Sequence, residues 1–212
     1  MSEVRIERLG PRETSLVAGR IAEAFMALDA PRWLVPDAGR RQSVLAGNFA
    51  ILVDHAMRYG LVHATADRAG VAVWFPSVGD PPPPPADYDA RLAAACGEWT
   101  DRFAHLDKLF EAHHPHPDHH HLAFLAVAPD RQGQGLGSAL LRHHHAVLDA
   151  EGVPGYLEAA SETGRDLYAR HGYQVAEPFH LPDGTPFWPM WREPAPDTTM
   201  AGPAGPAIAH HP

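Results

Sequence analysis

An apolar run, three closely spaced glycines and an amphipathic segment follow one another between residues 122 and 150. The run LAFLAVAP is apolar along its whole length, which is typical of a buried strand. The segment from about residue 135 to 150 has apolar residues at helical spacing. The side chains expected on its inner face are Leu136, Leu140 and Val147. A buried strand that leads through glycines into a helix favours an α/β architecture, in which helices cover a sheet.

The rest of the chain also alternates between strand and helix patterns. The stretch DAPRWLVPD is predicted to be a loop, and the five prolines at 81–85 a stiff spacer. Besides VRIERLG and LAFLAVAP, the predicted strands are 61–66, 71–75, 154–159, 173–180 and 187–192. The predicted helices are 13–28, 39–59, 86–113, 135–150 and 162–171. Together they predict a mixed central sheet of about seven strands flanked by helices.

Composition and length limit the function classes. The chain has 212 residues, 45% of them hydrophobic, which fits one domain over 1–193; the Pro-, Ala- and Gly-rich tail 194–212 is predicted to be disordered. The net charge of −9 argues against broad nucleic-acid binding. Neither a membrane-spanning run nor a secretory leader is visible, and Cys96 has no partner for a disulfide, so we expect a cytoplasmic protein. Monomer and homodimer both stay open.

The glycines at 133, 135 and 137 are placed to bind an anion. They lie between a predicted strand and a predicted helix, where backbone N–H groups lack partners and the helix dipole is positive. Glycine lets the backbone approach a pyrophosphate closely. A dinucleotide fingerprint would need a glycine where Ser138 stands, and a Walker loop would need a lysine. The spacing therefore excludes both familiar phosphate loops.

The pattern Gln132-x-x-Gly135-x-Gly137 after VAPD resembles the acetyl-CoA loop of the GCN5-related N-acetyltransferases (GNAT). The stretch GVPGYLEAASETGRDLYARHGYQV is similar to the second half of that family's motif, and LPDGTPFWPMWR to its closing hairpin. With VAVWFP included, the likeness is closest to puromycin N-acetyltransferase-like members. It covers residues 119–192, and 1–118 only by the order of elements.

The resemblance implies a sheet splayed between its fourth and fifth strands, with acetyl-CoA in the opening. The pantetheine would pair with residues 125–127 and the pyrophosphate would lie on the N–H groups of 132–138. The backbone N–H of Val127, released by a bulge, would stabilise the oxyanion. The expected cofactor-binding residues are Leu125, Ala126, Val127, Arg131, Gln132, Gly133, Gln134, Gly135, Leu136, Gly137, Ser138 and Tyr168.

Acetyl transfer to an amine needs a free lone pair, a stabilised oxyanion and a proton for the departing thiolate. Tyr168 matches the family's general acid, since a phenol has a pKa of about 10 and is protonated at neutral pH. Glu158, near the end of the fifth strand, could bind the ammonium or take its proton; a solvated carboxylate is the alternative. Trp33, Trp74 and Trp188 are candidates to line the acceptor pocket, although for each one alone the core is the favoured place.

One position departs from the family pattern. An asparagine that contacts the cofactor often lies four residues before the tyrosine, where this chain has Gly164; Ser161 or Thr163 could substitute. The histidine run 143–145 is expected on the wet face of its helix, because three consecutive helical residues cannot all turn to one metal ion. We therefore expect no metal.

The sequence thus predicts an acetyl-CoA-dependent N-acetyltransferase that modifies a primary amine of a small molecule, such as an antibiotic or a metabolite. Two alternatives remain. One is transfer from another carrier on the same fold, from a different acyl-CoA or an aminoacyl-tRNA. The other is a non-catalytic module that binds coenzyme A or a metal.

Overall fold

The computed structural model describes residues 4–80 and 82–195. From residue 196 onward, the tail expected to be disordered lies outside the described residues. The helices are α1 (Thr14–Phe25), α2 (Asp29–Leu34), α3 (Ala38–Tyr59), α4 (Tyr88–Cys96), α5 (Thr100–His113), α6 (Leu136–Glu151) and α7 (Glu162–Arg170), with 3-10 turns η1 (Pro11–Glu13), η2 (Gly97–Trp99) and η3 (Pro129–Arg131). The strands are β1 (Ile6–Arg8), β2 (Leu61–Thr65), β3 (Gly70–Ser77), β4 (His119–Val127), β5 (Gly155–Ala159), β6 (Gln174–Val175), β7 (Phe179–His180) and β8 (Pro186–Arg192).

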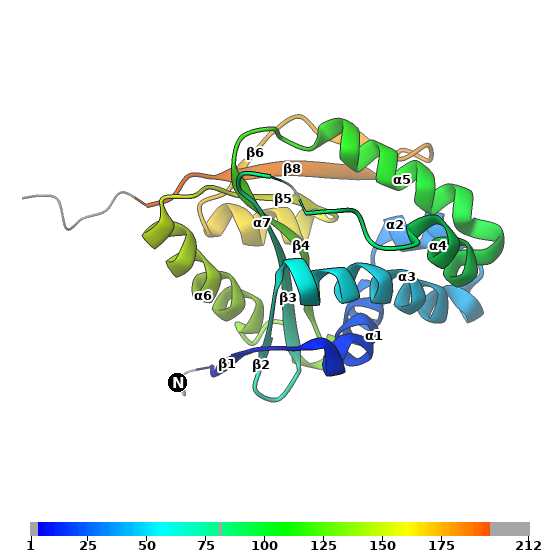
Figure 1. Cartoon of the computed structure of the whole chain (residues 1–212), viewed down its shortest axis with the longest axis horizontal. Helices are drawn as coiled ribbons and strands as arrows, with labels where there is room; N and C mark the ends of the chain where they lie inside the picture. Colours follow the sequence, from blue (N-terminus) through cyan, green and yellow to red (C-terminus); the bar gives the residue numbers. More distant parts are fainter. Residues whose placement is uncertain (1–3, 81, 196–212) are drawn as a thin grey trace, which may run out of the picture.

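The strands form one mixed sheet in the order β1-β2-β3-β4-β5-β8-β6, with β7 paired to β8 (Figure 1). Neighbours on this path are antiparallel except β4 and β5, which are parallel. The parallel pair requires a crossover, and α6 supplies it. The expected α/β architecture, a sheet of about seven strands flanked by helices, is confirmed.

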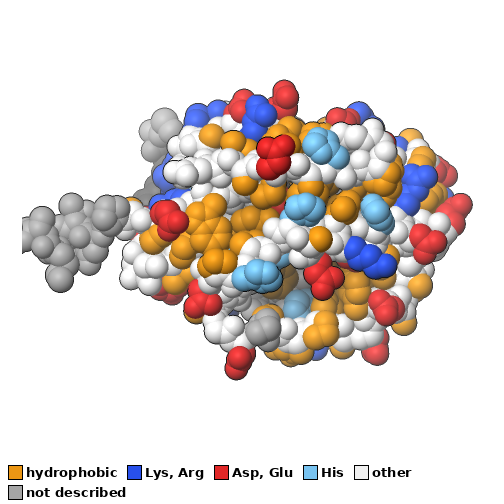
Figure 2. All heavy atoms as spheres, turned by 90° about the horizontal axis from the view of Figure 1, so that it is seen from above, with side chains coloured by type: hydrophobic (Ala, Val, Ile, Leu, Met, Phe, Trp, Pro, Cys, Tyr) orange, Lys and Arg blue, Asp and Glu red, His pale blue; other side chains and the backbone are white. Residues whose placement is uncertain are grey.

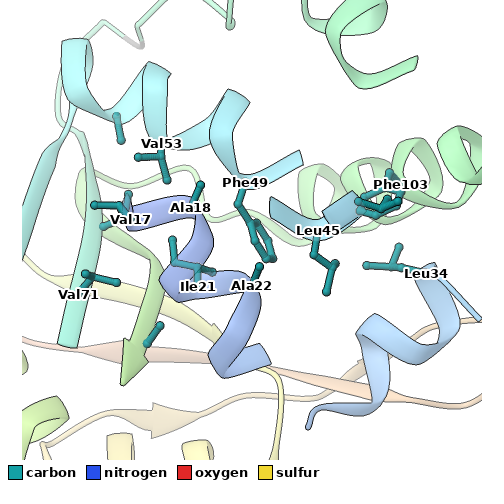
Figure 3. Packing of buried hydrophobic residues seen from close by; sticks show 14 of the residues in the cluster. Val17, Ala18, Ile21, Ala22, Leu34, Leu45, Phe49, Val53, Val71 and Phe103 are labelled. Carbon is teal, nitrogen blue, oxygen red and sulfur yellow. The ribbon is translucent and has the colours of Figure 1, made fainter. Parts of the chain in front are cut away.

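Helices α1 to α5 cover one face of the sheet. Successive turns of α1 contribute Val17 and Ile21, which pack with Phe49 of α3 and Val71 of β3 in one buried cluster (Figure 3). The rings of Phe49 and Phe124 meet edge to face, with centroids 5.0 Å apart. This core holds β3 and the second half of β4 against α1 and α3.

Helix α6 covers the opposite face, as Figure 1 shows. Its row Leu140, Leu141 and Leu148 packs on Leu157 of β5 and on Trp74 of β3. Val147, expected on the inner face, is only half-buried. The true inner row of α6 is Leu136, Leu140, Leu141, His144, His145 and Leu148.

Three expected elements differ in the structure. The predicted loop DAPRWLVPD contains α2, because Pro31 lies in its first turn, where a missing N–H is tolerated. The helix predicted over 86–113 is two helices, since Gly97 has φ +53° and turns the chain between them. The strand predicted over 173–180 is two short strands, β6 and β7, separated by residues 176–178.

No helix in the described ranges is long and apolar enough to cross a membrane. On the face in Figure 2, acidic and basic side chains are interspersed rather than gathered into separate fields.

Candidate active site

The strands β4 and β5 separate soon after they meet. They pair only at His120 with Gly155 and at His121 with Tyr156. Beyond these pairs β4 continues against β3 as far as Val127, while β5 continues against β8. The sheet therefore opens into a gap between the carboxyl ends of two parallel strands, the place where ligands bind in α/β sheets.

A β-bulge in β4 decides which backbone groups face this gap. Val73 pairs with Phe124 but Trp74 pairs with Leu122, so Ala123 is the extra residue. Past the bulge, the Ala128 N–H donates to the Ala69 carbonyl at 2.7 Å. Because groups alternate in an antiparallel ladder, the N–H groups of Leu125 and Val127 then point away from β3. The bulge lies four residues before Val127. The change of register that it causes turns the Val127 N–H away from β3.

The glycine turn between β4 and α6 presents unpaired donors. Gly133 has φ +74° and Gly135, the residue before α6, has φ +82°, so both occupy the region that favours glycine. No side chain caps the helix, which leaves N–H groups of its first turn available. A Cβ at either glycine would meet nothing within 4 Å, so the space above the turn is open. These features fit the pyrophosphate of a coenzyme A.

The side chains around the turn hold its shape. Gln132 donates through Nε2 to the Val127 carbonyl at 3.2 Å. Arg131 pairs with Asp67 at 2.9 Å and donates to the Gln134 side chain at 3.0 Å. Its guanidinium is therefore engaged with the protein, and Arg131 positions the turn in this structure. The Ser138 hydroxyl contacts Nε2 of His171 at 2.9 Å.

Tyr168 lies on α7 beside the same part of the sheet. Its half-buried ring meets Tyr173 edge to face at 6.0 Å, and burial raises the pKa of its phenol well above the usual range. Gly164, one turn earlier, donates its N–H to the Ser161 hydroxyl at 3.1 Å. A Cβ at Gly164 would lie only 3.2 Å from that oxygen. Ser161 is thus the N-cap of α7, and the glycine leaves room for the cap.

Glu158 of β5 lies on the opposite face of the sheet from α7 and is nearly buried. Its Oε2 lies 2.8 Å from Nε2 of His121, and only 6% of its side chain is exposed against 20% for His121. Burial raises the pKa of the Glu158 carboxyl, but the interactions with His121, followed by those with Tyr156 and His114, outweigh burial and the net shift of the pKa is downward. Glu158 is therefore a buried carboxylate paired with a histidine, rather than a solvated one.

The expected aromatic wall is only partly present. Trp188 lines a pocket of about 350 Å³ between the α1–α2 turn, the start of α7 and the β7–β8 turn. Trp33 is half-buried between α2 and α5, with the Arg102 guanidinium 5.4 Å from its ring centre. Trp74 is fully buried and stacks on His144 at 4.1 Å under α6. The expectation that Trp74 lines an acceptor pocket is therefore wrong, because it faces the other side of the sheet.

The histidines of α6 also differ from expectation. His144 is fully buried and His145 is 6% exposed, whereas His143 is exposed. Two of the three continue the buried row one turn after Leu140 and Leu141, so the interpretation of the run as a wet face is wrong. In the described part of the chain, no three His, Cys, Asp or Glu side chains converge as metal ligands would.

A family model and several solved structures are similar to this chain. The family model of the acetyltransferase (GNAT) domain matches residues 97–175, which include the gap and the glycine turn. A structure described as histone acetyltransferase HPA2 and related acetyltransferase, from Corynebacterium glutamicum, is 26% identical over 93% of this chain and 99% of that chain, with a TM-score of 0.68. The chain has the GNAT fold.

Two further GNAT neighbours share the fold at lower identity. PaiA N-acetyltransferase from Thermoplasma acidophilum, in complex with coenzyme A, is 12% identical over 91% of this chain and 99% of that chain, with a TM-score of 0.56. Arylalkylamine N-acetyltransferase 2 from Aedes aegypti is 14% identical over 91% and 99%, with a TM-score of 0.58.

One residue beside the gap, His121, is not among the site residues that the sequence predicts. The available signal was strand alternation: in HHHLAF, His119 and His121 face one side and His120 the other. Its partner Glu158 could not be assigned without the pairing of β4 with β5.

Proposed function

We propose that the protein is an acetyl-CoA-dependent N-acetyltransferase that acts on a primary amine of a small molecule. The observation that carries the proposal is the opening between β4 and β5, which leads to the uncapped first turn of α6. A gap lined by backbone N–H groups suits an extended pantetheine arm, and a helix N-terminus suits its pyrophosphate.

The residues that would hold the cofactor come from three elements. The backbone of residues 125–127 would pair with the pantetheine, residues 132–138 would receive the pyrophosphate, and Tyr168 would lie near the thioester. The bound cofactor supplies an activated acetyl group. The Val127 N–H polarises its carbonyl, and the Leu125 N–H, which faces the same gap, adds a second donor.

Tyr168 is proposed as the general acid. The Tyr168 hydroxyl makes no hydrogen bond to a described residue and is not among the fully buried unpartnered atoms, so a ligand can reach it. Burial raises the pKa of the phenol, so it is protonated across the neutral range, as a general acid must be.

The acceptor would enter from the pocket that Trp188 lines. Its walls combine apolar Leu28 and Trp188 with the carboxylates of Asp29 and Glu162. Ala160, which also lines the pocket, directly follows β5 and is two residues from Glu158 along the chain. A compact cationic amine fits this surface, and an aminonucleoside antibiotic such as puromycin belongs in the first panel of acceptors.

Calorimetry with acetyl-CoA tests the donor half of the proposal. We expect micromolar binding, with loss of affinity when the backbone turn is disturbed. The absence of binding at high micromolar cofactor would contradict the proposal. A thiol-release assay over a panel of primary amines, with propionyl-CoA as a second donor, then tests transfer and acyl preference.

A further inference from the structure

A side-chain contact joins the glycine turn to the helix of Tyr168. Nε2 of His171 lies 2.9 Å from the Ser138 hydroxyl. Ser138 lies in the first turn of α6. His171 ends α7, where its backbone N–H donates to the Tyr168 carbonyl at 2.9 Å. In the proposed function the first element receives the pyrophosphate of the cofactor and the second carries the general acid, so the contact links the two ends of the donor site.

Ser138 is placed to contact a bound phosphate. Ala139 is the first residue of α6 whose N–H donates along the helix, to the Gly135 carbonyl at 2.9 Å. The N–H groups of residues 136–138 come before it and have no partner within the helix. Ser138 is the last of these residues, and it is half-buried. A phosphate oxygen that accepts from this turn can therefore also accept from the serine hydroxyl.

The serine hydroxyl has a single hydrogen, and its direction decides what the ring must do. The contact fits a hydroxyl that donates to Nε2, and it equally fits an Nε2–H that donates to the hydroxyl. Once the hydroxyl donates to a phosphate oxygen, only its lone pairs are left for the ring. A bound pyrophosphate therefore selects the form of His171 in which Nε2 carries a hydrogen.

The other ring nitrogen of His171 is open to solvent. Nδ1 makes no hydrogen bond to a described residue and is not among the buried unpartnered atoms. A proton from solvent can therefore reach Nδ1, and a ring that already holds a hydrogen on Nε2 then becomes an imidazolium.

The charges around His171 decide whether this proton binds. Burial lowers the pKa of His171, and three nearby arginines lower it further. The charged groups on this side come from α6, α7 and β8, and are Arg142, Arg170, Arg192 and the partner of Arg192, Asp149. The ring of His145, with its centre 5.9 Å away, is neutral, since burial lowers its pKa to about 3. These surroundings oppose an imidazolium, whereas an anion bound at the turn favours one.

We propose that His171 is a positioning residue of the donor site: when coenzyme A binds, the ring takes a proton from solvent and donates its Nε2–H to Ser138, whose hydroxyl donates to the pyrophosphate. This rests on the proposed function. The bound protein then holds more protons than the free protein. Affinity for the cofactor therefore rises as the pH falls through the pKa that His171 has in the complex, and levels off below its pKa in the free protein.

Calorimetry with dephospho-coenzyme A, in buffers of different ionisation enthalpy, measures the proton uptake. This probe keeps the pyrophosphate, which does not titrate near neutral pH, and lacks the 3′-phosphate, which does. Wild-type protein should take up protons on binding, and its affinity should rise by about threefold to tenfold from pH 8 to pH 6, since one unit of pKa corresponds to a factor of about ten. H171Q has an amide that can still donate to Ser138 but cannot titrate. It should take up fewer protons, and its affinity should change by less than about twofold.

Two further variants locate the effect. S138A keeps the imidazole but removes the hydroxyl between the ring and the pyrophosphate, so its proton uptake should fall toward that of H171Q. H143Q, at an exposed histidine of the same helix, should keep the wild-type uptake. In the wild-type protein, NMR of the His171 imidazole should show a higher pKa with dephospho-coenzyme A than without it, a measurement that needs no substitution.

The outcomes separate the two levels of failure. Equal proton uptake in wild type and H171Q would overturn the role of His171, while binding of the probe upholds the donor site. A pKa of His171 that does not move in the wild-type protein would overturn that role in the same way. A wild-type protein that binds neither acetyl-CoA nor dephospho-coenzyme A would overturn this inference together with the proposed function.

Discussion

Tyr168 and Tyr173 form a matched pair of residues. Both are tyrosines whose pKa burial raises, and their rings touch. The Tyr173 hydroxyl is bound to Nε2 of His145 at 3.1 Å, whereas that of Tyr168 has no partner among the described residues. The Tyr168 hydroxyl is therefore the member of the pair that a ligand can contact.

Y168F should lower kcat by about 100-fold with little change in acetyl-CoA affinity, because the proton for the thiolate is lost while the ring still packs. The measurement is steady-state thiol release together with calorimetry. Y173F is the control: it removes a buried hydroxyl that faces His145 and should leave turnover near that of wild type. Equal turnover in Y168F and wild type would remove Tyr168 from the mechanism.

Helix α6 begins at a glycine for a conformational reason. Gly135 has φ +82°, which lies in a region of backbone conformation where an L residue with a side chain is strained by about 1–2 kcal/mol. G135A should therefore lower both the unfolding free energy, by about that amount, and the affinity for acetyl-CoA. Denaturant unfolding and calorimetry measure the two effects.

Gly137 is the control for the effect of Gly135 on stability, because its backbone is not strained. It lies inside α6 without positive φ, and an added Cβ would meet Leu125, Leu167 and Val127 at ordinary contact distances of 3.7–3.8 Å. G137A should be as stable as wild type or more so, since alanine favours a helix by up to about 1 kcal/mol. If G135A and G137A were equally stable, strain at Gly135 would be the wrong explanation.

At the level of elements, periodicity predicted most helices and strands, and glycine spacing predicted the turn before α6. The failures have physical causes. Proline usually breaks a helix, but Pro31 lies in a first turn, where it is tolerated. The positive φ of Gly97 bends the chain inside an apolar stripe that otherwise predicts one continuous helix. The buried face of α6 was also predicted incorrectly, because the polar residues His144 and His145 lie on it. Trp74 covers His144, and Tyr173 lies against His145.

The candidate site was predictable only where it is local in sequence. The turn 132–138 and the helix of Tyr168 are continuous segments with their own spacing. The gap between β4 and β5, the bulge at Ala123 and the contact of His121 with Glu158 depend on how distant strands pair. That pairing is a property of the tertiary structure, so residue patterns alone could not place it.

Over the whole molecule, buried neutral histidines join the sheet to α6. His144 stacks on Trp74, and its Nε2 lies 3.0 Å from Nδ1 of His120. Burial lowers the pKa of His63 to about 4, of His144 to about 2 and of His145 to about 3. The charged groups that face this layer are Arg8, Asp149, Glu151 and Arg192. The two carboxylates favour protonation, but burial dominates.

The layer should make the fold sensitive to acid. In the unfolded chain a histidine has a pKa of about 6.5, so below that value the unfolded state binds more protons than the folded state. Stability is therefore full above about pH 6.5 and falls as the pH drops toward the folded-state pKa values. Each of the three histidines should cost about 2 kcal/mol between pH 6.5 and pH 5. Urea unfolding at a series of pH values measures the loss.

H144F tests whether α6 is the origin of this sensitivity. Phenylalanine keeps a ring on Trp74 and removes the buried Nδ1 of His144, which has no partner among the described residues. The substitution also removes Nε2 of His144, so Nδ1 of His120 loses its contact. At neutral pH these effects oppose each other, so the unfolding free energy should change little. Below pH 6 one titrating group is missing, and the slope of unfolding free energy against pH should fall by about 1.4 kcal/mol per pH unit. H143F, at the exposed neighbour, should keep the wild-type slope. Identical slopes in H144F and wild type would mean that protonation elsewhere unfolds the protein in acid.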